Sequence, residues 1–478
     1  MGVFVSWIFL PIFSELKLTS VFKYFELRFN RRVRLLASGL YLFSSLIYLP
    51  VIIYVPALTF QRVTGLDTYV TVVALTVICA IYTAIGGFKA VIWTDVVQLI
   101  FMFGSLFTII IIGIYSANGV ENVIDAANRG GRLVIANYKE INSRSSIWGH
   151  VFSTSLVAVY QFGLNQTNIQ RFMSFSNLKT MRISVWILAA VFSIFMILSS
   201  ILGIIVYANY ESCDPFGAGL IKRIDHILPH FIQDKANLFL GFSGIFIAGL
   251  FSSSLSTSSS YLNAMSGIIY EDFISQRYPR MKESTAGKVM KATVFILAVF
   301  QIILVFFIEQ MGSILKIVTQ CMSLNACALL TLFALGVFIP HANSKGGQFG
   351  ALASIACILT LMLGSLNGVH EPTLPLRTDG CDLKIPLQLD TFNRTVNRLS
   401  DVLVKEAEEN DIFWIFKINY NYYGLIGIFI GLLVGSTVSF LTGGNAIKDQ
   451  KLIAKFLREK PLQEEEMILK KPIIQEQI

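Results

Sequence analysis

Long apolar runs recur along most of the chain, and they constrain its fold more than any other feature. Each run is about 20 residues long, the length that an α-helix needs to cross the hydrocarbon core of a bilayer. The runs are continuous rather than alternating, which excludes a transmembrane β-barrel. The sequence therefore predicts an all-α polytopic membrane protein with about ten complete transmembrane helices. The predicted spans are 36–62, 68–86, 90–117, 148–173, 181–208, 237–270, 288–311, 314–339, 347–368 and 420–442.

The composition agrees with a membrane protein and argues against a nucleic-acid partner. Charged residues make up 14% of the chain and hydrophobic residues 54%, whereas roughly a quarter of a soluble domain is charged. The formal net charge is +8, but the Lys and Arg residues lie in short loops between the apolar runs. The lipid bilayer is therefore an expected partner, and nucleic acid is not.

The distribution of basic residues predicts how the chain is oriented. Loop 14–35 is rich in Lys and Arg, and the positive-inside rule places such a loop in the cytoplasm. Counting spans from this loop puts the stretch 369–418 outside and the tail 443–478 in the cytoplasm. We therefore expect one transmembrane domain, residues 1–442, which contains the outside loop and is followed by a cytoplasmic tail. The basic residues of the first loop are Lys17, Lys23, Arg28, Arg31, Arg32 and Arg34.

The first 13 residues are apolar but too short to span a bilayer. They lack the basic segment that precedes the apolar core of a signal peptide. Residues 1–13 are typical of the second half of a transmembrane helix. We therefore expect the chain to be shortened at its N-terminus.

The outside loops carry two predicted covalent features. Asn393 begins an N-glycosylation sequon within the loop 369–418, so it is predicted to carry a glycan. Cys213 and Cys381 both fall in outside loops, where thiols can oxidise, and we predict a disulfide between them. A second sequon begins at Asn165, but it lies inside a predicted span and should stay unmodified.

A carboxylate lies inside one of the apolar runs. Asp95 follows the turn-like pair Gly86-Gly87 and precedes apolar sequence that continues to Tyr115. A charge at membrane depth costs several kcal/mol unless it faces protein or water, so the default interpretation is a functional one. The alternative is a residue near a helix end whose side chain reaches back to water.

Hydroxyl side chains form a run in the middle of the span 237–270. Ser253, Ser256, Thr257 and Ser260 follow the i, i+3, i+4, i+7 spacing, so they share one face of a helix. One interpretation is a face of small residues against which another membrane helix packs. The other is a site for a hard cation such as Na⁺, built from hydroxyl oxygens and the free carbonyls of broken helices.

Five side-chain amides crowd the second half of the span 148–173. Buried amides need partners in lipid, so this density indicates a polar cavity or a discontinuous helix. Hydrogen bonding between helices would explain one or two of them, but not easily five. Arg171, at the cytoplasmic end of this run, is expected to extend toward water. The amides belong to Gln161, Asn165, Gln166, Asn168 and Gln170.

The sequence offers no catalytic arrangement, so we do not expect an enzyme. The five histidines lie at span ends or in loops, without a nucleophile spaced beside them. No Gly-rich phosphate loop is present, which argues against an ATP-driven pump. A passive channel is disfavoured because no ring of charges or filter-like loop is visible. No cofactor is expected.

Three stretches resemble signatures of the sodium/solute symporter family. They are GGFKAVIWTD at 86–95, LTSVFKYFELRF at 18–29 and NQTNIQR at 165–171. Within that family, the chain is most similar to the sodium-coupled monocarboxylate and multivitamin transporters. The cues for this branch are CDP at 213–215, LSTSSS at 255–260 ahead of Glu271-Asp272, and LPL at 374–376 ahead of Gly380-Cys381.

The resemblance implies an inverted-repeat (LeuT-like) symporter fold that works by alternating access. By matched position, Ser256 and Thr257 correspond to hydroxyl ligands of the family's sodium site. Ser253 corresponds to a position that offers its backbone carbonyl, and Asp95 to a carboxylate important for sodium coupling. Substrate binding is assigned to the discontinuous helix. The residues expected to bind substrate are Asn165, Gln166 and Gln161.

The chain departs from the family pattern at its start, because it begins inside the second core helix. The first core helix would supply the remaining carbonyls of the sodium site. The expected function is sodium-coupled secondary active symport of a small organic monocarboxylate, either a short-chain acid or a vitamin of the biotin or pantothenate type, across the plasma membrane. Na⁺ would be the coupling ion. The alternative is a truncated, non-transporting membrane protein, either a regulatory isoform or an incomplete gene model.

Overall fold

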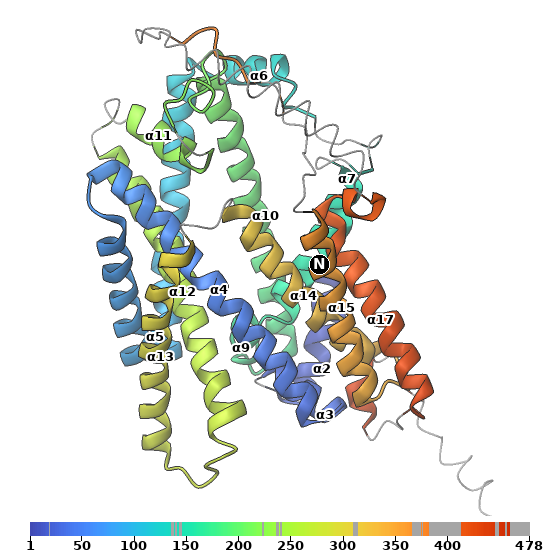
Figure 1. Cartoon of the computed structure of the whole chain (residues 1–478). Coiled ribbons are helices and arrows are strands. Elements are labelled where there is room, and N and C mark those ends of the chain that lie inside the picture. The colour runs from blue at the N-terminus through green and yellow to red at the C-terminus, as the bar shows by residue number, and fades with distance from the viewer. Residues whose placement is uncertain are drawn as a thin grey trace, which may run out of the picture.

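The structure is a computed structural model of the chain, and its helices are drawn in Figure 1. In this view α6 and α11 lie at one end of the molecule and α3 lies at the opposite end. We call the end with α3 the inner end and the end with α6 and α11 the outer end, after the predicted orientation. The described residues are 1–18, 20–134, 138, 141–142, 146–221, 224–235, 239, 241–308, 314–365, 374, 376–381, 413–444, 449–454 and 457–458.

The described part of the chain is all-α and contains no β-strand. The short N-terminal helices are α1 (Gly2–Phe4) and α2 (Leu10–Glu15), and α7 (Ile147–Gly149) is also short. The remaining helices are α3 (Val21–Arg28), α4 (Arg31–Thr64), α5 (Thr68–Ser116), α6 (Val120–Arg129), α8 (Ser155–Gly163), α9 (Gln166–Met173), α10 (Leu178–Asn209), α11 (Ile227–Asp234), α12 (Phe242–Ile268), α13 (Glu283–Ile308), α14 (Ile314–Phe338), α15 (Ser344–Gly364) and α17 (Tyr423–Leu441).

Six of the described helices are long and apolar enough to cross a membrane. They are α4, α5, α10, α13, α15 and the helix that ends at Leu441. Helix α12 is long enough to cross a membrane, but it is not among these six because the serines at its centre lower its mean hydropathy. The predicted span 148–173 is divided between α8 and α9, so neither part is long enough alone. The predicted all-α polytopic fold is confirmed.

Helix α5 is two antiparallel helices joined by a tight reversal. Gly87 has φ 57° and ψ −156°, which only glycine adopts without strain. The Tyr82 hydroxyl donates to the carbonyl of Leu255 on α12, and Asp95 accepts from the adjacent Ser256, although a straight helix would separate Tyr82 and Asp95 by roughly 20 Å. The reversal brings Asp95 back along the helix that precedes it. The predicted spans 68–86 and 90–117 are these two halves.

Helix α4 contains two prolines and remains continuous through both of them. Pro56 lacks the N–H group that would bond the carbonyl of Ile52, four residues earlier. The hydroxyl of Ser254 on α12 donates to that carbonyl instead, at 3.0 Å. The carbonyl that Pro56 leaves without a helical donor is therefore satisfied by the serine-rich helix α12.

The inner end of the molecule is organised around α3. Its aromatic residues Phe22 and Phe25 are fully buried. The Arg28 guanidinium donates to the backbone carbonyls of Gly336, Ile339, Pro340 and Ala342, which cap the end of α14. Because Arg28 satisfies these carbonyls, α3 is fixed against α14.

Part of the predicted cytoplasmic tail packs against this inner end. The hydroxyl of Tyr24 donates to the carbonyl of Leu452 at 2.9 Å, and Arg458 pairs with Glu15 at 2.8 Å. Leu452, Ile453 and Ala454 are buried. Residues 452–454 of the tail are therefore packed into the domain, whereas residues 449–451 are exposed.

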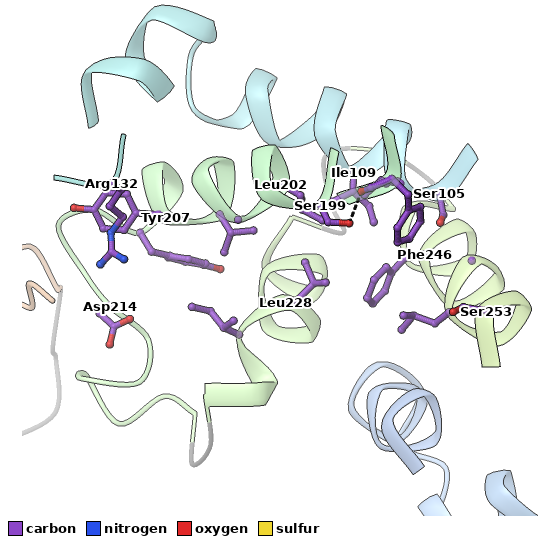
Figure 2. Close-up of a pocket in the computed structure, with 18 of the residues that line it drawn as sticks. Ser105, Ile109, Arg132, Ser199, Leu202, Tyr207, Asp214, Leu228, Phe246 and Ser253 are labelled. Atoms are coloured by element: carbon purple, nitrogen blue, oxygen red, sulfur yellow. Dashed lines mark hydrogen bonds between the residues drawn. The ribbon is translucent and has the colours of Figure 1, made fainter. Parts of the chain in front are cut away.

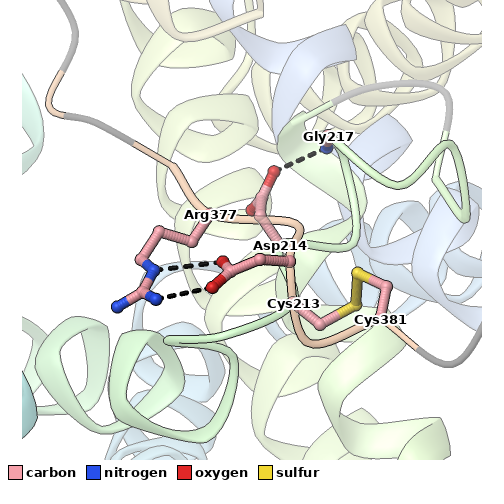
Figure 3. Close-up of a disulfide and its surroundings, with 6 residues drawn as sticks. Cys213, Asp214, Gly217, Arg377 and Cys381 are labelled. Carbon is pink, nitrogen blue, oxygen red and sulfur yellow. Dashed lines mark hydrogen bonds and ion pairs between the residues drawn. A yellow bond between two sulfur atoms is a disulfide. The ribbon is translucent and has the colours of Figure 1, made fainter.

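At the outer end a disulfide joins two distant loops, as Figure 3 shows. Cys213 and Cys381 are 168 positions apart, and their Cα atoms are 4.8 Å apart. Beside the disulfide, the backbone N–H of Asp214 donates to the carbonyl of Arg377 at 2.8 Å. The structure therefore contains the pairing that we predicted. The sequon at Asn393 lies outside the described residues.

Candidate functional site

Asp95 projects from the second half of α5 toward α9 and α12. Its side chain is 16% exposed. One carboxylate oxygen accepts a hydrogen bond from the Ser256 hydroxyl at 2.5 Å, and the other accepts one from the Arg171 guanidinium. The carboxylate is thus held by protein partners at membrane depth, as expected for a charge in a low-dielectric environment.

Arg171 is partly exposed, as expected for a side chain that extends toward water, but the sequence-based interpretation missed its protein partners. Its guanidinium pairs with Asp95 and donates to the Ser260 hydroxyl at 2.6 Å. The physical reason is charge balance, because a carboxylate in the membrane requires a cation. Arg171 is the one charged residue in the polar run 160–171, and this was the signal that could have identified it.

The hydroxyl face predicted on α12 borders this ion pair. Its four members are half-buried, whereas the neighbouring serines of the same run are buried. The Thr257 hydroxyl donates to the carbonyl of Ser253 at 3.0 Å, a bond within the helix that costs little. The half-buried set is Ser253, Ser256, Thr257 and Ser260; the buried set is Ser252, Ser254, Ser258 and Ser259.

The chemistry of this donor set is that of a hard-cation site. It combines hydroxyl and carboxylate oxygens with a backbone carbonyl, and oxygen ligands suit ions such as Na⁺, Mg²⁺ or Ca²⁺. Among the described residues, no group of three or more His, Cys, Asp or Glu is placed to hold a metal ion. The four oxygen-bearing residues are Asp95, Ser253, Ser256 and Thr257.

The amides of the broken helix meet a group of tyrosines. Asn165 is fully buried where α8 ends and α9 begins. Its side-chain oxygen accepts from the backbone N–H of Thr167 at 3.1 Å, so it caps α9. Its nitrogen donates to Gln161 at 3.1 Å and to the Tyr261 hydroxyl at 3.0 Å. The predicted discontinuous helix is therefore present, with two of its amides in contact.

Tyrosine hydroxyls and a further amide extend this group to α4 and α14. The Tyr41 hydroxyl on α4 donates to Asn165 at 3.3 Å. The amide of Asn325 on α14 donates to the Tyr160 hydroxyl at 2.6 Å. A small cavity of about 10 Å³ lies beside Tyr160 and Tyr261, which is room for about one water molecule. In this conformation the centre of the molecule is closed.

Gln166 bonds to a different helix from the other two amides predicted to bind substrate. Its side-chain oxygen accepts a hydrogen bond from the backbone N–H of Val21, at the start of α3, at 3.0 Å. Both residues are buried. Its assignment to substrate stays a prediction, and its observed contact connects α9 to α3.

Two larger cavities lie on either side of the closed centre. The outer cavity has a volume of about 490 Å³ and is lined by α5, α10, α11 and α12. Figure 2 shows Tyr207, Arg132 and Asp214 toward one part of it and Phe246 and Ser253 toward another. The inner cavity has a volume of about 550 Å³ and is lined by α5, α9, α12 and α13. Both cavities reach α12, the helix of the hydroxyl face.

Comparison with known sequences decides the family. The model of the sodium:solute symporter family matches residues 1–354. The chain belongs to the sodium:solute symporter family. It is 30% identical to sodium-coupled monocarboxylate transporter 1 of Mus musculus, over 95% of this chain and 75% of that protein. It is also 28% identical to a putative sodium-dependent multivitamin transporter of Drosophila melanogaster, over 91% of this chain and 72% of that protein.

A solved symporter shares the fold of this family member. The structure is of a Na⁺-coupled sialic acid symporter in a substrate-bound, outward-open state. It aligns with a TM-score of 0.70 and 21% identity, over 91% of this chain and 80% of that one. The chain is thus a multi-pass membrane protein with the inverted-repeat symporter fold, and its named relatives are transporters.

Proposed function

We propose that this chain is a sodium-coupled secondary active symporter of small organic monocarboxylates. The observation that carries the proposal is the contact between Asp95 and Ser256, which places a membrane-depth carboxylate on the hydroxyl face of α12. This contact lies beside the discontinuous helix formed by α8 and α9. An ion site next to a broken helix is the arrangement on which this class of transporter relies.

Na⁺ would bind between α5 and α12. The Ser256 hydroxyl donates its proton to Asp95, so its lone pairs are available to a cation. Thr257 would offer its hydroxyl oxygen, and Ser253 its backbone carbonyl. The Ser253 carbonyl accepts the helical N–H of Thr257 and also the Thr257 hydroxyl, so Na⁺ would take the place of the hydroxyl proton at this carbonyl. Asp95 would supply the negative charge.

The substrate carboxylate would bind at the amides of the broken helix. Amide N–H groups and the N-terminus of α9 attract an anion. Asn165 and Gln161 would contact it, and Gln166 would hold α9 in place behind them. The names of the relatives suggest either a short-chain monocarboxylate or a vitamin with a carboxylate group.

The sodium gradient and the membrane potential would supply the driving force. Each positive charge that moves inward gains about 2.3 kcal/mol per 100 mV. We place the protein in the plasma membrane with its C-terminus in the cytoplasm. The basic loop that includes α3 supports this orientation, as does the outer position proposed for Asn393 and the disulfide.

Uptake measurements test the proposal. Cells expressing the chain would be given labelled lactate, butyrate, nicotinate, biotin or pantothenate, each in Na⁺ and again in choline. Accumulation that requires Na⁺ supports the symporter and identifies its substrate. Absence of uptake for the whole panel, despite surface expression, would instead favour a non-transporting membrane protein.

A further inference from the structure

The Arg171 guanidinium occupies the same carboxylate to which Na⁺ is proposed to bind. It contacts one oxygen of Asp95 while Ser256 contacts the other. Its second contact, with Ser260 at 2.6 Å, lies one helical turn from Ser256 on the same face of α12. The Arg171 guanidinium is therefore a cation of the protein itself that contacts the proposed ion site.

Charge balance makes this arrangement sensitive to an added cation. Asp95 and Arg171 together are neutral. A Na⁺ ion at Asp95 would put two positive charges on one carboxylate, at a depth where an uncompensated charge is costly. The two cations therefore oppose each other's binding, and the opposition is reciprocal by linkage.

The structure has space for the Arg171 side chain away from Asp95. Its side chain is 36% exposed, so it is not enclosed by protein. Its neighbours Gln170, Met173 and Ser174 line the inner cavity of about 550 Å³. A displaced guanidinium can enter this space while its backbone stays in α9.

We propose that Arg171 is a tethered cation that Na⁺ displaces from Asp95, and that this exchange links the ion site to α9. The inference rests on the proposed symport function. Arg171 lies toward the inner end of α9 and Asn165 caps the outer end. Release of Arg171 frees one end of the helix whose other end meets the substrate. Arg171 is thus a positioning residue, and it sets both sodium affinity and the response of the substrate helix.

The decisive variant is Arg171→Gln, because removal of a competitor should strengthen Na⁺ binding. We expect the Na⁺ concentration for half-maximal uptake to fall by about fivefold or more. The substrate KM should also lose its dependence on Na⁺. Arg171→Lys keeps the charge and should stay closer to the wild type. Arg182→Gln is the matched control, since Arg182 contacts Trp7 and the carbonyl of Ser6 instead.

A binding measurement that does not require transport provides the second readout. The Na⁺-dependent rise in the melting temperature of the purified protein, without substrate, should reach half its value at lower Na⁺ in Arg171→Gln. Ser260→Ala removes one anchor of the guanidinium and should shift the same curve in the same direction. This variant tests the idea even if Arg171→Gln does not fold.

The possible outcomes separate this inference from the proposed function. Unchanged or weaker Na⁺ binding in both Arg171→Gln and Ser260→Ala would overturn the exchange and leave Arg171 a structural partner of Asp95. If uptake and melting temperature of the wild type do not depend on Na⁺, the proposed symport and the exchange are both overturned. Stronger Na⁺ binding in the variants, with Arg182→Gln unchanged, supports the exchange.

Discussion

The side-chain oxygen of Gln166 accepts a hydrogen bond from the backbone N–H of Val21, 145 positions away, at 3.0 Å. The bond joins the first turn of α9 to the first turn of α3. Both groups are buried, so neither can turn to water instead. Since α3 also holds α14 through Arg28, these contacts connect the broken helix to α14 at the inner end of the molecule.

Replacement of Gln166 by Ala should therefore destabilise the protein. The N–H of Val21 would lose its acceptor in a buried place, at a cost of roughly 1–3 kcal/mol. Gln166→Glu keeps an acceptor oxygen and should cost less. Thermal unfolding of the purified protein measures the loss, with the half-buried Gln170→Ala as control. Unaltered stability together with a raised substrate KM would instead show that Gln166 binds the substrate.

Loss of the Thr257 hydroxyl oxygen or of the Asp95 negative charge should weaken coupling to Na⁺. In both Thr257→Ala and Asp95→Asn we expect the Na⁺ concentration for half-maximal uptake to rise roughly tenfold or more. Thr257→Ser keeps the hydroxyl and should behave like the wild type. The half-buried Thr108, whose hydroxyl bonds to the carbonyl of Gly104 in the same way, provides the control Thr108→Ala. Wild-type Na⁺ dependence in both ligand variants would refute the assigned site.

Removal of an amide donor should weaken substrate binding selectively. Gln161→Ala should raise the substrate KM about tenfold, since a hydrogen bond to a charged group is worth roughly 1.5–3 kcal/mol. The half-saturating Na⁺ concentration at high substrate should stay within about twofold. Uptake titrations measure both quantities, with Asn209→Ala at the outer end of α10 as control. If KM does not change, the carboxylate binds elsewhere.

The disulfide should make a large contribution to the stability of the outer end. A cross-link between Cys213 and Cys381 restricts the unfolded chain over 168 positions, and native disulfides contribute about 2–4 kcal/mol. Cys213→Ser, Cys381→Ser and the double variant should therefore be equally destabilised. Peptide mapping without reductant should recover the linked pair. A larger loss in the double variant than in either single one would show that the two cysteines do not act together.

The outer ion pair between Arg129 and Glu211 predicts a pH-dependent contribution to stability. Two hydrogen bonds of 2.8 Å from the Arg129 guanidinium hold the pKa of the Glu211 carboxyl below its usual range. A carboxyl with a lowered folded pKa stabilises above its unfolded pKa, about 4.3, and loses that contribution as pH falls through the folded value. Arg129 is exposed and Glu211 is half-buried, so solvent screens the pair and the effect should be small.

The measurement is the difference in melting temperature between wild type and Glu211→Gln. It should be present at neutral pH and should vanish as the solution is acidified below the usual glutamate range. Glu121→Gln, on the exposed side of α6, is the control. A difference that grows on acidification would contradict the sign of the shift.

Local sequence signals predicted much of the architecture. The gap between the apolar runs at Gly86-Gly87 predicted the reversal in α5, since only glycine adopts the dihedral angles of Gly87. The amides around Asn165 predicted the broken helix because buried amides require partners. The spacing of Ser256 and Ser260 predicted one face, and both side chains do meet the same ion pair.

Local sequence patterns could not predict the contacts between helices that are distant in the sequence. The pairing of Arg171 with Asp95 depends on how α9 packs against α5, which no local pattern specifies. The direction of Gln166 depends on the position of α3 in the same way. The burial of Leu452 and Ile453 was missed because charge dominates the surrounding tail.

The bond from Ser254 to the carbonyl of Ile52 makes a serine on one helix dependent on a proline on another. If Pro56 were replaced by alanine, the restored N–H would take that carbonyl and leave Ser254 without its partner. If Ser254 were lost while Pro56 stayed, the carbonyl would be stranded in the membrane interior. The two positions should therefore vary together among relatives, and a variant at either one should be interpreted with the other in view.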